Sequence, residues 1–447
     1  MSPPEALRER LGELLGRAQA ERRSPSVSAN VFRDGQVVWR GAVGLADIAR
    51  GEDATPEHAY RIGSITKTFT AVSILRLRDE GFLSLDDPLR THIPEIPPGP
   101  TIRDALSHLS GLQREPPGEV WETLRPPSRE ELLAGLEDAE QVLAPGQAWH
   151  YSNLAFGLLG EVVARRSAAG YEDELRARVL DPLGLSHTAW EPSGPRATGY
   201  YVDPWSDGVT VEPDMPIEGP TAAMGWLWST VGDLALWGDF LSTGNDAVLG
   251  RSAVDEMARV RTMVDHEHWD IGWGLGLALY RRGDRVFAGH GGAMPGFLAA
   301  VIVHRGERIG AAVLANSTAG FDPEGLALDL TCAALELLPR AQEPWRADDG
   351  APSEVAAILG RWWSEGSELL LTWDRGRLRL EHLAGVPGRN LSWLVLEGED
   401  RWRIAEGREL GELLRVVRDA SGAPVKLYVA TYPLTRVPAS FADILSP

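Results

Sequence analysis

The chain of 447 residues contains a single cysteine, Cys332. One cysteine excludes an intrachain disulfide, so the fold depends on its core and its hydrogen bonds. Cys332 stands in the apolar run Leu328-Asp-Leu-Thr-Cys-Ala-Ala-Leu335. This run predicts a core position on a helix rather than a reactive nucleophile.

Basic residues are scarce relative to acidic ones. The chain carries 44 Lys and Arg against 64 Asp and Glu, which gives a formal charge of −20. A charge of this sign repels phosphate backbones and anionic lipid surfaces, so we expect neither nucleic acid nor membrane as a partner.

Long apolar runs are also missing. No window of about 18 apolar residues indicates a membrane span. Residues 1–23 place leucines at helical spacing among Arg and Glu and lack a secretory apolar core, so we expect a cytoplasmic protein. With 43% hydrophobic residues, the chain is long enough for a sizeable core and more than one domain.

The most specific feature is Ser64 followed by Lys67, in the segment Arg61-Ile-Gly-Ser-Ile-Thr-Lys-Thr-Phe-Thr70. At the start of a helix, this spacing puts the hydroxyl and the ammonium on one face. A serine hydroxyl is a poor nucleophile at neutral pH, and an amine one turn away can accept its proton. The same spacing also occurs on ordinary solvated helices, so it needs support from elsewhere in the chain.

Two further segments supply that support. Tyr151-Ser-Asn153 follows the turn-rich stretch 145–150, and His290-Gly-Gly292 lies between two predicted strands. A phenol and an imidazole suit proton handling, while an amide can orient a carbonyl and an ammonium together. No serine stands in a Gly-x-Ser-x-Gly elbow, which disfavours an α/β-hydrolase. The three segments together predict serine acyl transfer.

The order Ser-x-x-Lys, Tyr-x-Asn, His-x-Gly resembles the penicillin-binding-protein and class C β-lactamase superfamily of serine hydrolases. Residues 106–112, 226–234 and 273–276 resemble further landmarks of that family, and the resemblance covers roughly residues 24–340. His290-Gly-Gly292 replaces the Lys-Thr-Gly of classical β-lactamases, as in esterase, D-aminopeptidase and carboxypeptidase relatives. This substitution argues against efficient β-lactam hydrolysis.

The resemblance implies a role for each motif residue. Ser64 is the nucleophile, and Lys67 and Tyr151 share its proton, with either of them as the acylation base. Asn153 donates to the substrate or to Lys67, unless it only caps a helix. His290 lines the opposite wall, unless it only satisfies a turn.

The remaining expectations concern the walls of the cleft. The family match places the oxyanion hole at the backbone N–H groups of Ser64 and Ala293. Gly291 and Gly292 allow a substrate strand to approach closely. Tryptophans either wall the acyl pocket or are buried core, and the three in question are Trp226, Trp228 and Trp273. We expect His266 and His268 to lie in a surface loop rather than to bind a metal. We expect no cofactor either.

The periodicity predicts an α+β fold in residues 1–340, namely an antiparallel sheet flanked by helices with a helical subdomain inserted at 101–190. The resemblance points to the same β-lactamase/transpeptidase-like fold. Its main elements are a hairpin at 27–45 around Asp34-Gly35, a helix from Ser64 to about Asp79, a hairpin at 286–316 and a closing helix at 322–338.

Residues 341–352 form a polar linker, after which the pattern changes. Regularly spaced short alternating runs in residues 353–447 predict a small β-barrel, and similar family members carry a lipocalin-like domain here. The runs are 369–373, 378–382, 393–397, 401–405, 413–418 and 425–432. Arg436 is a candidate for holding a substrate carboxylate, or an exposed arginine at the end of an edge strand.

Three functions remain open. The first is a hydrolase that cleaves an ester, an amide or a D-amino-acid-containing peptide through a Ser64 acyl-enzyme. The second is a stand-alone penicillin-binding-protein-type thioesterase that macrocyclises a nonribosomal peptide taken from a peptidyl carrier protein. The third, a non-catalytic binding protein, requires a broken motif, and none of the three motifs is broken.

Overall fold

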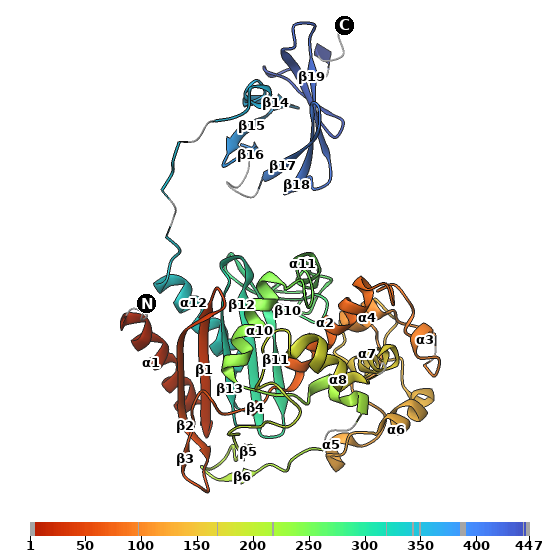
Figure 1. The fold of residues 1–447 in the computed structure, drawn as a ribbon, viewed down its shortest axis with the longest axis vertical. Helices are drawn as coiled ribbons and strands as arrows, with labels where there is room; N and C mark the ends of the chain where they lie inside the picture. Colours follow the sequence, from red (N-terminus) through yellow and green to blue (C-terminus); the bar gives the residue numbers. More distant parts are fainter. Residues whose placement is uncertain are drawn as a thin grey trace. The chain divides into compact units, whose positions relative to one another are not determined.

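The computed structural model describes residues 5–443 except 97, 168, 217–218, 319, 342–343, 348–349, 385–389 and 441. The chain divides into two compact units, Met1–Arg340 and Ala341–Pro447 (Figure 1).

The N-terminal unit is built on a nine-stranded sheet of order β3-β2-β1-β13-β12-β11-β10-β9-β8, in which every pair is antiparallel. The strands are β1 Ser26–Arg33, β2 Gln36–Asp47, β3 Glu52–Asp53, β8 Thr262–Met263, β9 Ile271–Trp273, β10 Ala278–Arg282, β11 Arg285–Met294, β12 Phe297–His304 and β13 Ile309–Ala315. Between β1 and β2, Asp34 and Gly35 both have positive φ, the conformation that a two-residue hairpin loop requires. The antiparallel sheet expected from the sequence is confirmed.

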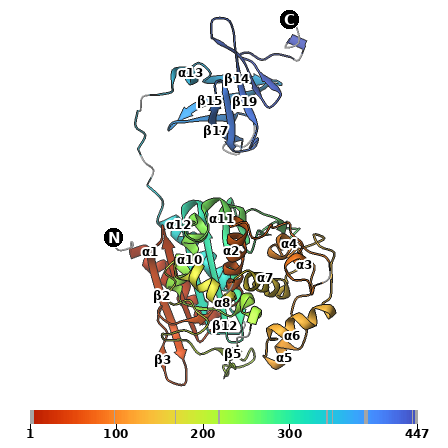
Figure 2. The same ribbon diagram turned by 45° about the vertical axis from the view of Figure 1, so that its right-hand side comes forward.

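Helices cover both faces of this sheet, so its central strands are buried on both sides (Figure 2). In β13, Ala311 and Val313 join the core under α1 (Glu5–Glu21) and α12 (Pro323–Leu337). The alternate residues Ala312 and Leu314 join the core under α2 (Thr66–Asp79) and α10 (Val231–Thr243). The predicted closing helix is therefore α12, and it contains Cys332, which is partly buried.

The helical subdomain lies on the α2 side of the sheet. Its helices are α3 Leu89–His92, α4 Ile102–Leu106, α5 Val120–Thr123, α6 Arg129–Ala134, α7 Asn153–Arg166, α8 Tyr171–Leu175 and α9 Ala222–Gly225. Every residue of α2 from Thr66 to Leu77 is buried between this subdomain and the sheet. A helix enclosed on all sides has few ways to shift, so the N-terminus of α2 is a rigid place for a reactive group.

The C-terminal unit is an antiparallel eight-stranded sheet in which sequence neighbours pair in order from β14 to β21. The strands are β14 Gly360–Ser364, β15 Ser367–Asp374, β16 Arg377–His382, β17 Leu391–Gly398, β18 Arg401–Glu406, β19 Leu413–Arg418, β20 Pro424–Val429 and β21 Tyr432–Leu434. A bridge between Trp363 and Thr435 joins the two ends of the sheet into a nearly closed barrel. The expected barrel is confirmed, with β14 added and the run 425–432 divided at Ala430, where φ is positive.

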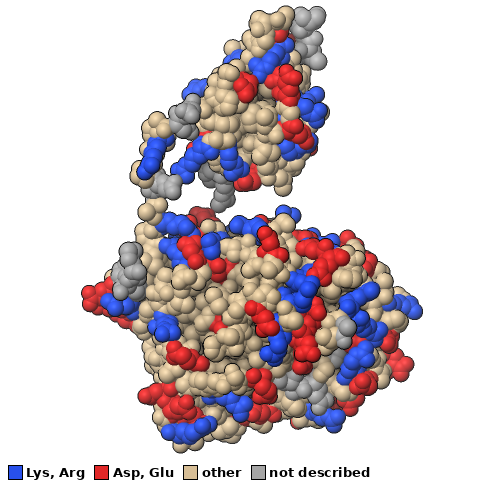
Figure 3. All heavy atoms as spheres, viewed as in Figure 1, with Lys and Arg blue, Asp and Glu red and all other residues tan. Residues whose placement is uncertain are grey.

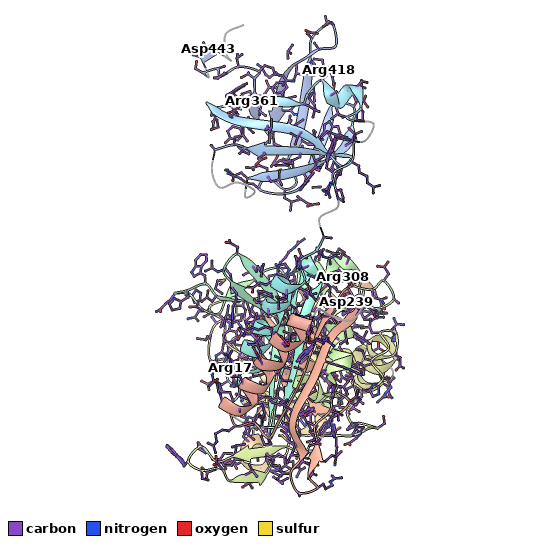
Figure 4. The ribbon with its side chains drawn as sticks, turned by 90° about the vertical axis from the view of Figure 1, so that its left-hand side faces the viewer. Arg17, Asp239, Arg308, Arg361, Arg418 and Asp443 are labelled. Carbon is purple, nitrogen blue, oxygen red and sulfur yellow. The ribbon has the colours of Figure 1, made fainter. Side chains whose placement is uncertain are left out.

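Charged side chains of both signs are interspersed over the face shown in Figure 3. Arg308 and Asp239 point toward each other in Figure 4, with Nη2 and Oδ1 2.9 Å apart, and this pair ties the β12–β13 turn to α10. None of the helices in the described part of the chain has both the length and the apolar character that a bilayer-spanning segment requires.

Candidate active site

Two glycines bring the segment that carries Ser64 against strand β11. The two-residue strand β4 (Tyr60–Arg61) leads into a 3-10 turn, Gly63–Ile65, directly before α2. A Cβ atom on Gly63 would lie 2.5 Å from the Ala293 amide nitrogen, and a Cβ on Gly292 would lie 1.9 Å from the Ile62 carbonyl oxygen. Only glycine permits such close contact. The Ser64 amide nitrogen would also lie 3.0 Å from a Cβ atom on Gly292. The main-chain amides of Ser64 and Ala293, the two predicted donors of the oxyanion hole, therefore both lie where the Gly63 segment meets β11.

Lys67 meets Ser64 from one turn further along α2. Its Nζ donates to Ser64 Oγ at 2.9 Å and to the carbonyl oxygen of Met224. Burial lowers the pKa of Lys67 to about 7, with Arg114 acting in the same direction and Glu115 against it. At neutral pH a substantial fraction of this amine is therefore free to accept a proton.

Tyr151 closes the group around Ser64. The Lys67 Nζ lies 5.2 Å from the centre of the Tyr151 ring. Burial raises the pKa of Tyr151 far above its usual range, although a hydrogen bond to Ser64 opposes this shift. The phenol is thus held in its protonated form. Of the two groups that contact Ser64, only Lys67 has a pKa near neutrality.

His290 lines the same cavity from β11. Its Nδ1 is hydrogen-bonded to the carbonyl oxygen of Gly291, while its buried Nε2 has no partner among the described residues. Burial lowers the pKa of His290 to about 3, with the charge of Lys67 adding to the effect, so the ring is neutral at physiological pH.

A cavity of about 1160 Å³ opens over these groups. Among the described residues that line it are all of the predicted motif side chains except Lys67, which is buried behind Ser64. The predicted residues on its wall are Ser64, Tyr151, Asn153, Trp273, His290, Gly291, Gly292 and Ala293.

Several cavity residues were not predicted from the sequence. Asn153 Nδ2 donates to Glu115 Oε1 at 2.8 Å rather than to Lys67, and Ser152 is the residue that caps α7. Glu115 also faces Arg114, with Nε and Oε1 3.4 Å apart. Arg114 and Glu115 lie two and three residues after the landmark at 106–112, so their position in the sequence was the signal available. Glu324 and Tyr280 also line the cavity, but no such signal in the sequence marks either residue.

A buried histidine supports Tyr151 from behind. The ring centres of His108 and Tyr151 are 4.2 Å apart, and those of His108 and Trp273 are 4.9 Å apart. His108 Nδ1 accepts a hydrogen bond from the Ser152 amide at 3.1 Å. His108 therefore fixes a loop, and that loop carries Tyr151.

The other two tryptophans do not line the cavity. Trp226 and Trp228 are 4% and 2% exposed, and the Arg61 guanidinium lies 4.8 Å from the ring centre of Trp228. The pairing of β4 with β7 (Trp228–Ser229) holds this segment in the core, below the surface of the cavity. Their role as pocket walls is not supported, and they are the buried core of the alternative interpretation.

Arg436 is occupied within the barrel. Its guanidinium lies 3.9 Å from the ring centre of Trp362 and donates to the carbonyl oxygens of Ala357 and Leu359 at 2.7 and 2.9 Å. An arginine whose donors are bound to main-chain oxygens has little left for a substrate carboxylate. These contacts favour the structural interpretation of Arg436 over a role in holding a substrate carboxylate.

The chain belongs to the Beta-lactamase family, whose model matches residues 11–334. Residues 351–436 match a second model, described as a domain of unknown function (DUF7586). The resemblance inferred from the motifs is therefore confirmed.

Individual proteins are similar over much of the chain. Esterase EstB of Burkholderia gladioli is 30% identical over 61% of this chain and 79% of its own length. The D-stereospecific amidohydrolase from Streptomyces sp. has a TM-score of 0.62 and 27% identity over 74% of this chain and 98% of that one. SurE, solved with D-Leu, has a TM-score of 0.60 and 26% identity over 97% of this chain and 100% of that one. Some curated relatives are longer, and the chain spans 44% of the length of one of them.

Proposed function

We propose that this protein is a serine hydrolase that cleaves esters and D-amino-acid amides through an acyl-enzyme on Ser64. The observation that carries the proposal is the 2.9 Å hydrogen bond between Lys67 Nζ and Ser64 Oγ, made by an amine whose pKa is about 7. The named activities of EstB and of the amidohydrolase support these two substrate classes.

The geometry supports a two-step reaction. Lys67 takes the proton of Ser64 while Oγ bonds to the substrate carbonyl carbon, and the negative charge that develops on the carbonyl oxygen meets the amides of Ser64 and Ala293. Tyr151, held protonated beside Ser64, passes a proton to the leaving group and regains one from Lys67. In the second step, water attacks the acyl carbon and gives a proton to Lys67. The bond between the acyl carbon and Oγ then breaks, Oγ takes up the proton from Lys67, and the acid is released.

The pH dependence of turnover tests this assignment. With a neutral p-nitrophenyl ester, kcat/KM should rise with pH along a single limb centred at about 7 and then level off, because only the unprotonated Lys67 is a base. A panel of D- and L-aminoacyl p-nitroanilides should give turnover that favours the D form. Lys67→Arg, which keeps a positive charge but cannot deprotonate, is the control and should be inactive at every pH. An identical pH profile in Lys67→Arg would contradict the proposal.

A second candidate keeps the acyl-enzyme and replaces water with an amine of the same substrate. In this case the protein is a thioesterase that cyclises a peptide taken from a peptidyl carrier protein. A cavity of about 1160 Å³ is larger than a single aminoacyl group requires, and SurE, solved with D-Leu, is similar over both units of the chain.

A peptidyl thioester with a free N-terminal amine distinguishes the two functions. Mass spectrometry of the products should show the linear acid if water is the acceptor, and a product lighter by one water if the amine is. Exclusive formation of the linear acid across peptide lengths would exclude the cyclase.

A further inference from the structure

Strand β11 has a free edge beside Ser64. Strand β10 pairs with β11 only as far as the pair Ala278 and Gly289, whereas β12 pairs with it as far as Met294. Among the described strands, residues 290–293 thus have a partner on one side only. Such an edge binds an extended substrate through its main-chain groups, and successive side chains flank that substrate from opposite faces.

On the α2 face of this edge stands His290, whose tautomer follows from its partner. A carbonyl oxygen only accepts hydrogen bonds, so the Nδ1 bonded to the Gly291 oxygen carries the hydrogen, and Nε2 carries the lone pair. This Nε2 has no partner in the described part of the chain, and the side chain is 4% exposed. A buried acceptor on the wall of a cavity requires a donor, and the substrate is the molecule that enters there.

On the α12 face of the same edge stands Glu324, in the first turn of α12. A Cβ atom at Gly291 would lie 1.7 Å from Glu324 Oε1, so the carboxylate rests directly against the strand. Within the described residues no basic side chain pairs with it. Burial raises the pKa of Glu324, and the nearby charge of Asp322 acts in the same direction, while a hydrogen bond from its own main-chain amide opposes the shift.

Of the four other carboxylates that the structure describes on the cavity wall, three accept hydrogen bonds from other residues and the fourth, Glu122, is exposed. Glu115 accepts from Asn153, Glu212 accepts from Thr318, and Asp322 caps α12 by accepting from the Gly325 amide at 2.8 Å. Five carboxylates and one arginine are found among the described residues that line the cavity. The cavity is therefore acidic, and Glu324, a half-buried carboxylate with no basic partner among the described residues, lies at the substrate edge.

We propose that Glu324 and His290 Nε2 together bind a primary ammonium group of the substrate, so that the enzyme selects amine-bearing over carboxylate-bearing substrates. This inference rests on the proposed Ser64 acyl-transfer function and adds a substrate class to it. An ammonium has three donors and no acceptor, which matches two acceptors on opposite faces of one strand edge. A carboxylate placed there would meet a like charge and a lone pair.

Matched p-nitrophenyl esters with 6-aminohexanoyl, heptanoyl and adipoyl acyl groups test the acyl side of the cavity, because these chains are too long to cyclise rapidly onto the ester carbonyl. Acetate esters of 4-(aminomethyl)phenol, 4-methylphenol and 4-hydroxybenzoate test the leaving-group side. In at least one series, kcat/KM for the cation should exceed that for the neutral ester by on the order of ten- to a hundredfold, the effect of a charge-assisted hydrogen bond, and the anion should be the poorest substrate.

The variant Glu324→Gln should reduce this cation-to-neutral ratio toward one. Glu336→Gln, which removes the same charge from an exposed position on the far end of α12, should keep the wild-type ratio. Glu324→Lys should invert the preference toward the adipoyl or hydroxybenzoate ester, and thermal unfolding of each variant checks that it is folded.

The outcomes separate this inference from the proposed function. If wild-type protein turns over the neutral esters but shows no cation preference in either series, or if Glu324→Gln keeps the full ratio, the ammonium site is wrong and the acyl-enzyme stands. If the neutral esters are not turned over and Ser64 takes no covalent label, the proposed function fails first.

Discussion

Replacement of Ser64 by alanine should abolish turnover and remove the site of covalent labelling. In the wild-type protein, a fluorophosphonate or a penicillin should form an adduct on the peptide that contains Ser64, because this serine has both an activating amine at 2.9 Å and neighbouring main-chain amides. Loss of a nucleophile that acts as part of a unit costs on the order of 10⁴–10⁶ in kcat. Peptide mass mapping and ester kinetics measure the two effects.

The control for Ser64→Ala is Ser421→Ala, at an exposed position in the barrel, which should label and turn over as the wild type does. Equal labelling of Ser64→Ala and wild type, or an adduct on a different serine, would contradict the mechanism. Unchanged ester turnover in Ser64→Ala would point to a nucleophile outside the three motifs.

The parts of the fold that the sequence predicts are those that local chemistry determines. Asp34 and Gly35 adopt the backbone that their hairpin needs, and the apolar runs around Arg305–Glu307 become β12 and β13. The two-residue strands β4 and β7 are too short to show any periodicity, yet their pairing holds Trp226 and Trp228 in the core. For this reason the sequence left open whether these two tryptophans are pocket wall or buried core, and the structure places them in the core.

The residues of the candidate site also fall into two groups, those that a local motif identifies and those that only packing brings to the site. Ser64, Lys67 and Tyr151 were identified because each belongs to a motif, and the structure brings them together. Glu324 looks like any acid in the first turn of a helix, where the helix dipole favours negative charge. Its contact with Gly291 depends on how α12 packs against the sheet, which residue spacing does not reveal.

The choice between lysine and arginine in this chain carries a further signal for the site. Of the 44 basic residues in the chain, only Lys67 and Lys426 are lysines. An arginine side chain stays protonated in proteins, whereas a buried lysine can lose its proton near neutral pH. Nearly all basic residues of this chain are arginines. A lysine at position 67 is therefore a sign that the site needs a cation that can lose its proton.

The two interpretations of Arg436 show the same limit of sequence patterns. The end of an edge strand was recognised correctly, but an arginine there can reach either outward or back over the barrel. Its stacking on Trp362 and its bonds to main-chain oxygens near Pro352–Leu359 use donors that the substrate would have needed.

Lys67→Met and Tyr151→Phe should each lower kcat/KM for a neutral ester by roughly 10²–10⁴-fold, the usual contribution of general acid–base catalysis. Methionine fills the space of a fully buried lysine, and phenylalanine keeps the ring contact with His108, so both variants retain the packing around Ser64. Because both groups serve one proton path, the double variant should lose little more than the poorer single variant.

Stability provides an independent check on the same pair. The pKa of Lys67 is about 7 in the folded chain, below the ordinary value for lysine, so at pH 7 the unfolded state binds this proton more tightly and folding is penalised. Lys67→Met removes the penalty and should unfold at a temperature equal to or above that of the wild type, while Tyr151→Phe should change little. A double variant whose activity loss equals the product of the single losses would show that Lys67 and Tyr151 act independently. A strongly lowered melting temperature in Lys67→Met would show that the buried amine supports the fold rather than only the chemistry.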